Sequence, residues 1–273
     1  MDNRLQDIKK LLNVAPLNDV TTVLDIGAGQ GQLAKYFSEL GKKVTCTGVQ
    51  INSYVSDVDS LHDKYGIEYI ECDIESMPFP DCSFDMVVLS HVLEHCPNVS
   101  SALGHVRRVL NNGGLLLVFV PPVEDVVCAG HISVGWNVGQ LMYVLLLNGF
   151  DVRSGNFIEY GYNVCGFVRR TERLLPSLRF DQGDISTLIR NDWFPTQIGC
   201  SNVDNFNGNI RSVNWPNVSD FRAGIDERGL KRFIILVVKY VIPSSVIYRI
   251  GNSLLRLGRL FVKISDQKAG HSS

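Results

Sequence analysis

A glycine-rich turn is the first feature of this sequence whose residue types and spacing can do chemistry. Asp25 stands two residues before Gly27, and Gly29 and Gly31 follow at every second position. An apolar, β-branched run precedes the turn and helical spacing follows it, which predicts a strand turning sharply into a helix. The free N–H groups of such a turn can face a ligand. A dinucleotide site usually has the spacing GxGxxG. The spacing here is GxGxG, which disfavours a nicotinamide dehydrogenase.

Two histidines four residues apart form a second candidate group. His91 and His95 follow an apolar run at 84–89, and their spacing would put both on one face of a helix. The spacing is also that of metal ligands. The sequence reads HxxxH rather than HExxH, however, with Glu94 beside the second histidine and no third ligand evident. No metal is therefore predicted.

The elements that must position these groups alternate between strand-like and helix-like patterns, which predicts βαβ units and a parallel sheet. Strands are expected at 20–26, 44–49, 67–72, 84–89, 115–120, 152–160 and 162–168. Helices are expected at 5–12, 32–40, 55–65, 99–110 and 139–147. Residues 176–225 are rich in Asn, Asp, Gly, Ser and Pro, and are interpreted as a loop-rich insertion over the body.

The composition is that of a globular chain: of 273 residues, 45% are apolar and 20% are charged. The net charge of −2 hides an asymmetry. Residues 1–227 hold 17 basic and 27 acidic side chains, a charge of −10, whereas 228–273 hold 9 and 1, a charge of +8. The acidic body disfavours nucleic acid as a partner. Seven cysteines without a CxxC pair, and no apolar signal core at the start, predict reduced thiols and a cytoplasmic location.

The basic tail has a pattern of its own. Residues 231–263 are apolar with interposed Lys and Arg, and Pro243 divides them into two expected helices. The longest uncharged run, 240–248, is far shorter than the ~20 residues that cross a bilayer. The pattern is typical of an interfacial membrane helix, and equally of a helix packing its apolar stripe on the body. The charge of +8 favours the membrane surface.

The glycine turn with its acid resembles motif I of the class I S-adenosylmethionine-dependent methyltransferases. S-adenosylmethionine presents a carboxylate for the turn N–H groups and a cationic part for Asp25. The segments 85–97 and 108–114, and a strand ending in Val120-Pro-Pro, are similar to the "LEH" and "RVLxxGG" segments of the small-molecule branch of this family. The resemblance covers roughly residues 20–170. It implies a doubly wound α/β fold, with seven mostly parallel strands in the order 3-2-1-4-5-7-6 and the seventh antiparallel.

The resemblance also implies which residues hold the cofactor. Gln50 stands where the family has an acid that binds both ribose hydroxyls; its amide can donate and accept, but it lacks the charge of a carboxylate. Asp73 and Ile74 stand where the family contacts adenine, although Asp73 on its own equally fits a solvated acid at a strand end. The predicted cofactor-binding residues are Asp25, Gly27, Ala28, Gly29, Gly31, Gln50, Asp73, Ile74 and Ser90.

The catalytic prediction concerns the stretch after the fifth strand, which borders the acceptor pocket in this family. A "GH" pair followed by a helix and a "GF" pair recurs there, and His131 is therefore predicted as the general base for a hydroxyl acceptor. His91 is the second candidate, followed by Glu124 and Asp125. The family's "LEH" histidine, here His95, is more often an orienting or structural group than a base.

Several acceptors can be argued against. Nucleobase amino-methyltransferases carry an (Asp/Asn/Ser)-Pro-Pro-aromatic motif after the fourth strand, where this chain has Leu-Ser-His-Val. Cytosine C5 enzymes need a Pro-Cys nucleophile, whereas Cys96 precedes Pro97. A small molecule, a lipid or a lipid-linked glycan is the expected acceptor, with O-methylation the expected reaction. Residues 160–170 resemble methyltransferases of bacterial surface-polysaccharide clusters, which indicates polysaccharide biosynthesis.

The sequence therefore predicts an enzyme in three parts. These are a methyltransferase domain at 1–170, a loop-rich polar extension at 171–227 and a basic amphipathic helical tail at 228–273. The tail would place the protein peripherally on the inner face of a membrane. Two alternatives remain: a quinone or lipid C-methyltransferase, and a non-catalytic scaffold in which Gln50 marks the loss of tight cofactor binding.

Overall fold

An eight-stranded sheet forms the centre of the computed structural model, which describes residues 3–49, 58–124, 127–181, 183–195 and 210–221. The strands are β1 (Thr22–Ile26), β2 (Lys43–Gly48), β3 (Glu68–Glu71), β4 (Phe84–Ser90), β5 (Leu110–Val120), β6 (Phe150–Tyr160), β7 (Asn163–Arg170) and β8 (Ser212–Val213). Their order is β3-β2-β1-β4-β5-β7-β6-β8, with β1 to β5 parallel and β7 antiparallel to both its neighbours. The predicted order is confirmed, and β8 extends it by one antiparallel edge strand.

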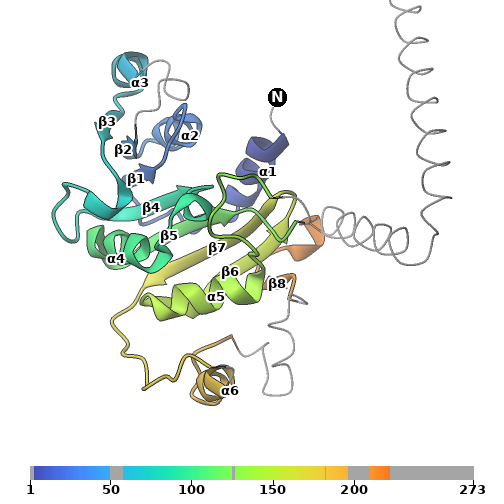
Figure 1. Ribbon diagram of the computed structural model, residues 1–273. Helices are drawn as coiled ribbons and strands as arrows, with labels where there is room; N and C mark the ends of the chain where they lie inside the picture. Colours follow the sequence, from blue (N-terminus) through green and yellow to red (C-terminus); the bar gives the residue numbers. More distant parts are fainter. Residues whose placement is uncertain (1–2, 50–57, 125–126, 182, 196–209, 222–273) are drawn as a thin grey trace, which may run out of the picture. The chain divides into compact units, whose positions relative to one another are not determined.

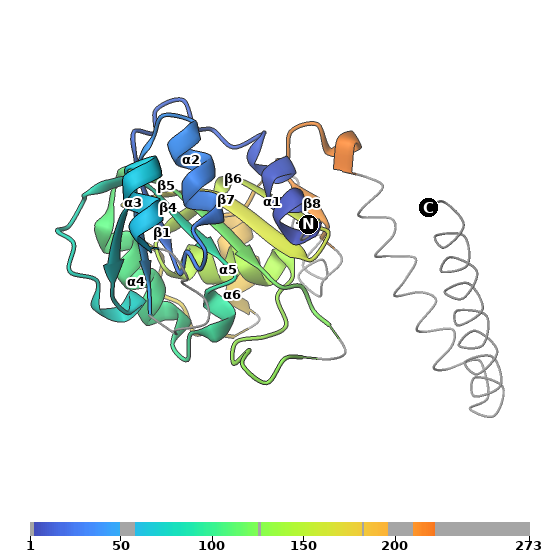
Figure 2. The ribbon, with the colours of Figure 1, turned by 90° about the horizontal axis from the view of Figure 1, so that it is seen from above.

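Helices cover both faces of this sheet. They are α1 (Asn3–Leu12), α2 (Gln32–Glu39), α3 (Val58–Tyr65), α4 (Val99–Val109), α5 (Val138–Leu147) and α6 (Gly183–Arg190), with short 3-10 turns η1 (Ile74–Ser76), η2 (Leu93–His95) and η4 (Val218–Phe221). Figure 1 shows α1, α2 and α3 on one side of the sheet and α4 and α5 on the other, and Figure 2 looks onto the side of α2 and α3. Because both faces are covered, the centre of β4 (Met86 to Leu89) and the second half of β5 are continuous buried apolar runs.

The segment after β7 is more ordered than the sequence predicts. It contains α6 and β8, and it places Trp193, Phe194 and Val213 in the main hydrophobic core. The helix was missed because it lies in a stretch rich in Asn, Asp, Gly, Ser and Pro, which favours loops, and the strand because two residues are too few for a periodicity to be recognised. Aromatic side chains and the buried aliphatic side chains Ile185 and Leu188 of α6 pack this segment on the body.

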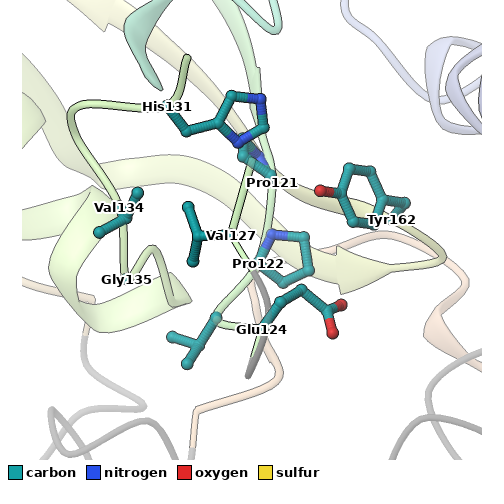
Figure 3. Close-up of a pocket in the computed structure, with 9 residues that line it drawn as sticks. Pro121, Pro122, Glu124, Val127, His131, Val134, Gly135 and Tyr162 are labelled. Atoms are coloured by element: carbon teal, nitrogen blue, oxygen red, sulfur yellow. The ribbon is translucent and has the colours of Figure 1, made fainter. Parts of the chain in front are cut away.

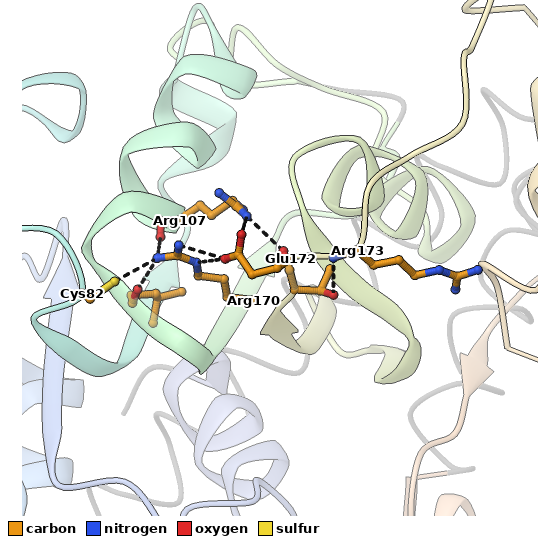
Figure 4. Close-up of polar contacts among 7 residues, drawn as sticks. Cys82, Arg107, Arg170, Glu172 and Arg173 are labelled. Atoms are coloured by element: carbon orange, nitrogen blue, oxygen red, sulfur yellow. Dashed lines mark hydrogen bonds and ion pairs between the residues drawn. The ribbon is translucent and has the colours of Figure 1, made fainter.

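A cluster of arginines connects the end of β7 to the junction of α4 and β5 (Figure 4). Arg170, whose side chain is only 12% exposed, donates to the backbone carbonyls of Arg107 and Leu110 at 2.9 and 2.7 Å. It also pairs with Glu172, which accepts from Arg107 on its other oxygen. The hydrogen bond from Arg170 lowers the pKa of Glu172. These contacts lie at the amino-terminal edge of the parallel strands, and they fix β7 against its neighbours there.

Replacing Arg170 with methionine is expected to lower the free energy of unfolding by about 2–3 kcal/mol, because two partly buried carbonyls lose a charged donor. Urea denaturation followed by circular dichroism measures this. Arg190→Met is the matched control, because Arg190 is exposed and its side-chain hydrogen bonds within the described ranges go to Ser186 and Thr187 of its own helix. The control should change stability by no more than about 0.5 kcal/mol. Equal effects of the two substitutions would show that the Arg170 cluster stabilises nothing.

Two predictions concern parts of the chain that the structure does not describe. The basic helical tail at 228–273 and the expected start of the helix at 55 lie outside the described residues. The domain boundaries at 170 and 227 stay predictions. Within the described ranges, no helix has the length and apolar character that crossing a membrane requires.

Candidate functional site

The turn between β1 and α2 is built on three glycines in the left-handed region, with φ of +68°, +53° and +68° at Gly27, Gly29 and Gly31. A Cβ on Gly27 would lie 2.7 Å from a methyl of Val92, and one on Gly31 would lie 2.9 Å from Leu61. At Gly29, no atom of the described residues lies within 4 Å of that position. The outer two glycines therefore allow close packing, whereas Gly29 faces open space.

Backbone hydrogen bonds hold this turn in place. The N–H of Ala28 donates to the carbonyl of Thr47 at the end of β2, at 3.0 Å. The N–H of Gly31 donates back to the carbonyl of Ala28 at 2.9 Å, and Gly31 then begins α2. The turn is therefore fixed to the sheet before any ligand binds, which lowers the entropy lost on binding.

Asp25 lies beside the turn and is only 2% exposed. One carboxylate oxygen, Oδ2, is buried and has no hydrogen-bond partner among the described residues. Burial raises the pKa of Asp25 to about 7, and a hydrogen bond from the Ala34 backbone offsets part of the rise. A buried carboxylate without a partner is costly, and a cationic ligand group would satisfy it.

The other predicted cofactor residues that are described lie at the same edge of the sheet. Asp73 follows β3 and caps η1, where its Oδ1 accepts from the Glu75 backbone N–H at 2.8 Å. Ile74 follows it and is partly buried. Ser90 is the last residue of β4, which runs parallel to β1. Gln50 lies outside the described residues. The structure thus brings Asp25, the glycine turn, Asp73, Ile74 and Ser90 to the carboxyl ends of three parallel strands, where open α/β sheets bind ligands.

The imidazole ring of His91 is fixed in place by contacts on both of its nitrogens. It adopts a left-handed φ of +57°, and its side chain is 9% exposed. Its Nδ1 lies 3.0 Å from Oε1 of Glu94, and its Nε2 lies 3.0 Å from Oδ1 of Asn163 at the start of β7. The ring also stacks on Tyr162, with centroids 5.8 Å apart. Both ring nitrogens therefore have partners, and His91 links the end of β4 to β7.

The prediction that one helix carries His91 and His95 on the same face is wrong. Only the single turn η2 forms there, and His91 precedes it. Pro97 follows the turn and disfavours helical conformation at Cys96, so no longer helix can form. His95 instead points its Nδ1 to the carbonyl of Gly130 at 2.9 Å, in the loop after β5.

A pocket of about 110 Å³ opens at the same edge, between the end of β5 and the start of β7 (Figure 3). His131 and Tyr162 flank its floor, which Pro121 and Pro122 provide. The described residues that line it are Pro121, Pro122, Val123, Glu124, Val127, His131, Val134, Gly135 and Tyr162. Apolar side chains form most of this wall, so the pocket suits an apolar ligand with one polar group near His131.

The loop that carries His131 is anchored at both ends. Pro122 and Trp136 form a backbone bridge, and the N–H of Val123 donates to the carbonyl of Trp136 at 3.0 Å. Further along, the N–H groups of Ile132 and Ser133 donate to the carbonyl of Glu94 at 2.7 and 3.0 Å. His131 is therefore positioned by hydrogen bonds on either side of it in the chain.

Sequence reasoning placed His131 at this pocket, but it did not identify Tyr162 or the two prolines as its walls. The proline pair after a buried strand was an available signal for the pocket wall. Prolines end a strand because they cannot donate to its hydrogen-bond ladder. The role of Tyr162 depends on the antiparallel pairing of β7 with β5, which no local pattern reports.

The pocket and the glycine turn are joined by one short segment. Val92 contacts Gly27 on one side, while His91, its neighbour, stacks on Tyr162 of the pocket. Residues 91–92 therefore lie against both the glycine turn and a residue that lines the apolar pocket. Two adjacent sites at one sheet edge allow one ligand to react with another.

Comparisons with known proteins identify relatives of part of this chain. Residues 24–118 match the family model described as a methyltransferase domain. Curated relatives named "Ubiquinone/menaquinone biosynthesis C-methyltransferase UbiE" include one from Vibrio vulnificus (strain YJ016), 33% identical over 137 residues, 47% of this chain and 53% of the relative. Another, from Hahella chejuensis, is 38% identical over 118 residues, 40% of this chain and 47% of the relative. The chain thus spans about half the length of the curated relatives it matches.

Solved structures share the fold. The 1,6-didemethyltoxoflavin-N1-methyltransferase of Burkholderia thailandensis aligns with a TM-score of 0.53 and 17% identity, over 63% of this chain and 79% of that chain. A SAM-dependent methyltransferase from Aquifex aeolicus aligns with a TM-score of 0.51 and 22% identity, over 62% and 93%. The family match begins in β1 and ends in β5, so it contains the glycine turn and the strand ends beside it, and these findings support a class I S-adenosylmethionine-dependent methyltransferase.

Proposed function

We propose that this chain transfers a methyl group from S-adenosylmethionine to a small apolar molecule that carries an ionisable hydroxyl, of the phenol or quinol class. The observation that carries the proposal is that residues 91–92 lie against both the glycine turn, with its buried carboxylate, and Tyr162 of the apolar pocket that holds His131. The glycine turn offers a carboxylate for the cationic methyl donor, and the pocket offers apolar walls and a histidine for the acceptor.

The residues of the first space fit the cofactor. The unpartnered Oδ2 of Asp25 suits a cationic group, and the open position at Gly29 leaves room for a ligand against the backbone. S-adenosylmethionine supplies a methyl group on a positively charged sulfur, which an electron-rich atom can take directly. In this proposal the cofactor is held by the described residues named above, together with Gln50.

The residues of the second space fit the acceptor. Proline and valine side chains favour an apolar ring over a sugar, and His131 is the group that removes the hydroxyl proton. Loss of that proton makes both the oxygen and the neighbouring ring carbon more nucleophilic. The names of the relatives support the ring carbon as the methylated atom. O-methylation of the same hydroxyl is the second candidate, because it needs the same base.

A membrane-dissolved acceptor also fits the rest of the chain. Quinols with apolar substituents partition into membranes, and the basic amphipathic pattern at 231–263 is typical of an interfacial segment. The membrane-surface placement and a lipid-linked acceptor are thus part of the proposal.

The test is methyl transfer from labelled S-adenosylmethionine to a reduced prenylated naphthoquinol. We expect methylated product from the unmodified chain, and mass spectrometry of the product distinguishes carbon from oxygen methylation. His131→Asn is expected to lower kcat by about 100-fold or more, because a positioned base is lost. The KM for S-adenosylmethionine should stay nearly constant, since His131 lies in the acceptor pocket.

His62→Asn is the matched control, because His62 is exposed on α3 and its side chain pairs, among the residues that the structure describes, only with its neighbour Asp63. It should leave kcat unchanged. Cofactor binding without methylation of any quinol or phenol would disprove the acceptor class, and an unaltered kcat in His131→Asn would remove His131 from the proton transfer. If the chain binds no cofactor at all, the scaffold alternative gains support.

A further inference from the structure

We propose that Glu94, His95 and His131 form a binding site for a transition-metal ion of the zinc class at the edge of the acceptor pocket. One ligand atom from each of the three side chains lies within 4.8 Å of the other two. Two imidazoles and one carboxylate are a ligand set typical of Zn²⁺ and its neighbours in the first transition row, and not of Mg²⁺ or Ca²⁺. The i, i+4 spacing in the sequence suggested His91 and His95 as a ligand pair. In the fold, His131 rather than His91 lies beside His95.

Glu94 supplies the observation that points to a ligand. Its side chain is completely buried, and its Oε1 faces Nδ1 of His91 at 3.0 Å. The other oxygen, Oε2, is buried without a hydrogen-bond partner among the described residues. An unsatisfied buried carboxylate oxygen is costly in free energy. A cation bound next to it would remove that cost.

His95 presents the correct nitrogen. Its Nδ1 lies 2.9 Å from the carbonyl oxygen of Gly130, and a carbonyl can only accept, so Nδ1 carries the proton. Nε2 then has the free lone pair that a metal requires. A backbone carbonyl that fixes the tautomer of a histidine in this way is a usual partner of a metal ligand.

His131 is brought to the other two ligands by the backbone. The carbonyl of Glu94 accepts from both Ile132 and Ser133, and the hydroxyl of Ser133 donates to the carbonyl of Cys96 at 2.9 Å. The rings of His95 and His131 meet edge to face, with centroids 5.0 Å apart. The loop after β5 is therefore tied to η2 at the point where the three side chains converge.

The remaining adjustment is small. Bonds of about 2.1 Å in a tetrahedral site place ligand atoms roughly 3.4 Å apart, so the three atoms must close by at most about 1.4 Å from their 4.8 Å limit. Rotation of His95, which is exposed, and of the half-buried His131 can supply this without moving Glu94. The fourth position would remain open toward solvent, as in metal sites that accept an exogenous ligand.

Occupation of this site has a consequence that rests on the proposed function. A metal ion takes the lone pair of His131, and that histidine can then no longer accept the proton of the acceptor hydroxyl. Zn²⁺ would therefore inhibit methyl transfer by withdrawing the base, while cofactor binding at the glycine turn continues.

The binding test uses the full chain after chelator treatment and dialysis. We expect one equivalent of Co²⁺ to produce the visible absorption of a tetrahedral site, and Zn²⁺ to displace it with micromolar affinity in calorimetry. His95→Ala should weaken Zn²⁺ binding at least tenfold, and His62→Ala should not change it. His95 is exposed, so its truncation should not unfold the protein. No binding, or equal binding by His95→Ala, would overturn the site.

A second experiment, on methyl-transfer activity, tests whether Zn²⁺ bound at this site inhibits the reaction. His95 contacts the ring of His131, so each protein is compared with itself: the ratio of methyl-transfer rates with and without Zn²⁺ should fall well below one in the unmodified chain and stay near one in His95→Ala. Inhibition that persists in this variant would show that Zn²⁺ acts elsewhere and would overturn the inhibitory role. If no acceptor is methylated under any condition, the proposed function fails, while the Co²⁺ spectrum still decides whether the site exists.

Discussion

The Gly29→Arg variant is expected to lose at least about 100-fold in affinity for S-adenosylhomocysteine while keeping the fold. Gly29 is the one glycine of the β1–α2 turn whose Cβ position meets no described atom within 4 Å, so an arginine there extends into the space assigned to the cofactor. The φ of +53° adds strain of about 1–2 kcal/mol for any residue other than glycine. Calorimetric titration measures the affinity, and thermal unfolding measures the strain.

Gly41→Arg separates the two effects. Gly41 also has a left-handed φ, +75°, and a Cβ position without neighbours, but it follows α2 at its opposite end. This variant should show the same loss of stability and bind the cofactor normally. Normal binding by Gly29→Arg would show that the cofactor does not occupy the turn. Absence of binding in the unmodified chain would make the glutamine at position 50 decisive in favour of a scaffold.

The Asp25→Asn variant is expected to lose at least about tenfold in cofactor affinity and yet to be more stable than the unmodified chain at pH 8. The folded-state pKa of about 7 lies above the unfolded value of about 3.9. The folded protein therefore binds the extra proton between these values, and its stability falls as the pH rises from about 4 to about 7. The loss amounts to at most about 4 kcal/mol, and asparagine, which does not titrate, avoids it.

Urea denaturation at pH 5 and pH 8 measures the stability difference between the two proteins. Calorimetry at the same two pH values measures their affinity for S-adenosylmethionine. Affinity of the unmodified chain for S-adenosylmethionine should rise between pH 6 and pH 8, because the cationic group needs the ionised carboxylate. A flat affinity profile would disprove the pairing of Asp25 with a cation. A pH-independent stability difference between the two proteins would disprove the raised pKa.

Asp85→Asn is a control that should change stability at pH 8 in the opposite direction to Asp25→Asn. Burial raises the pKa of Asp85, but hydrogen bonds from Thr22, Thr21 and Asn111 outweigh this and bring it below the usual value. Its contribution to stability is therefore present above the unfolded pKa and is lost as the pH falls through the folded one. Asp85→Asn should be destabilising at pH 8, where Asp25→Asn is stabilising.

Local patterns in the sequence predict the parts of this protein that depend on neighbouring residues. The strand order follows from alternating apolar runs and helical segments, and the glycine turn follows from the spacing of Gly27, Gly29 and Gly31. Both depend on short stretches of chain, which is why they could be recognised.

Long-range pairing decides what the sequence did not predict. His91 and His95 were expected on one helix face, but Asn163 of β7 binds the ring of His91 from the other half of the chain. The same pairing of β7 with β5 places Tyr162 opposite His131. No periodicity within residues 91–95 contains this information, because it depends on which strand becomes the neighbour of β5.

The bridge between Pro122 and Trp136 brings together the two ends of the segment that carries His131, so this segment can be exchanged as one unit. Both ends of the segment that carries His131 lie together at the end of β5, so a replacement of different length closes the same gap at little entropic cost. The strands that carry Asp25, the glycine turn and Asp73 all precede this segment in the chain. Grafting new segments between these two anchor points should therefore diversify the accepted substrates while the methyl donor stays the same.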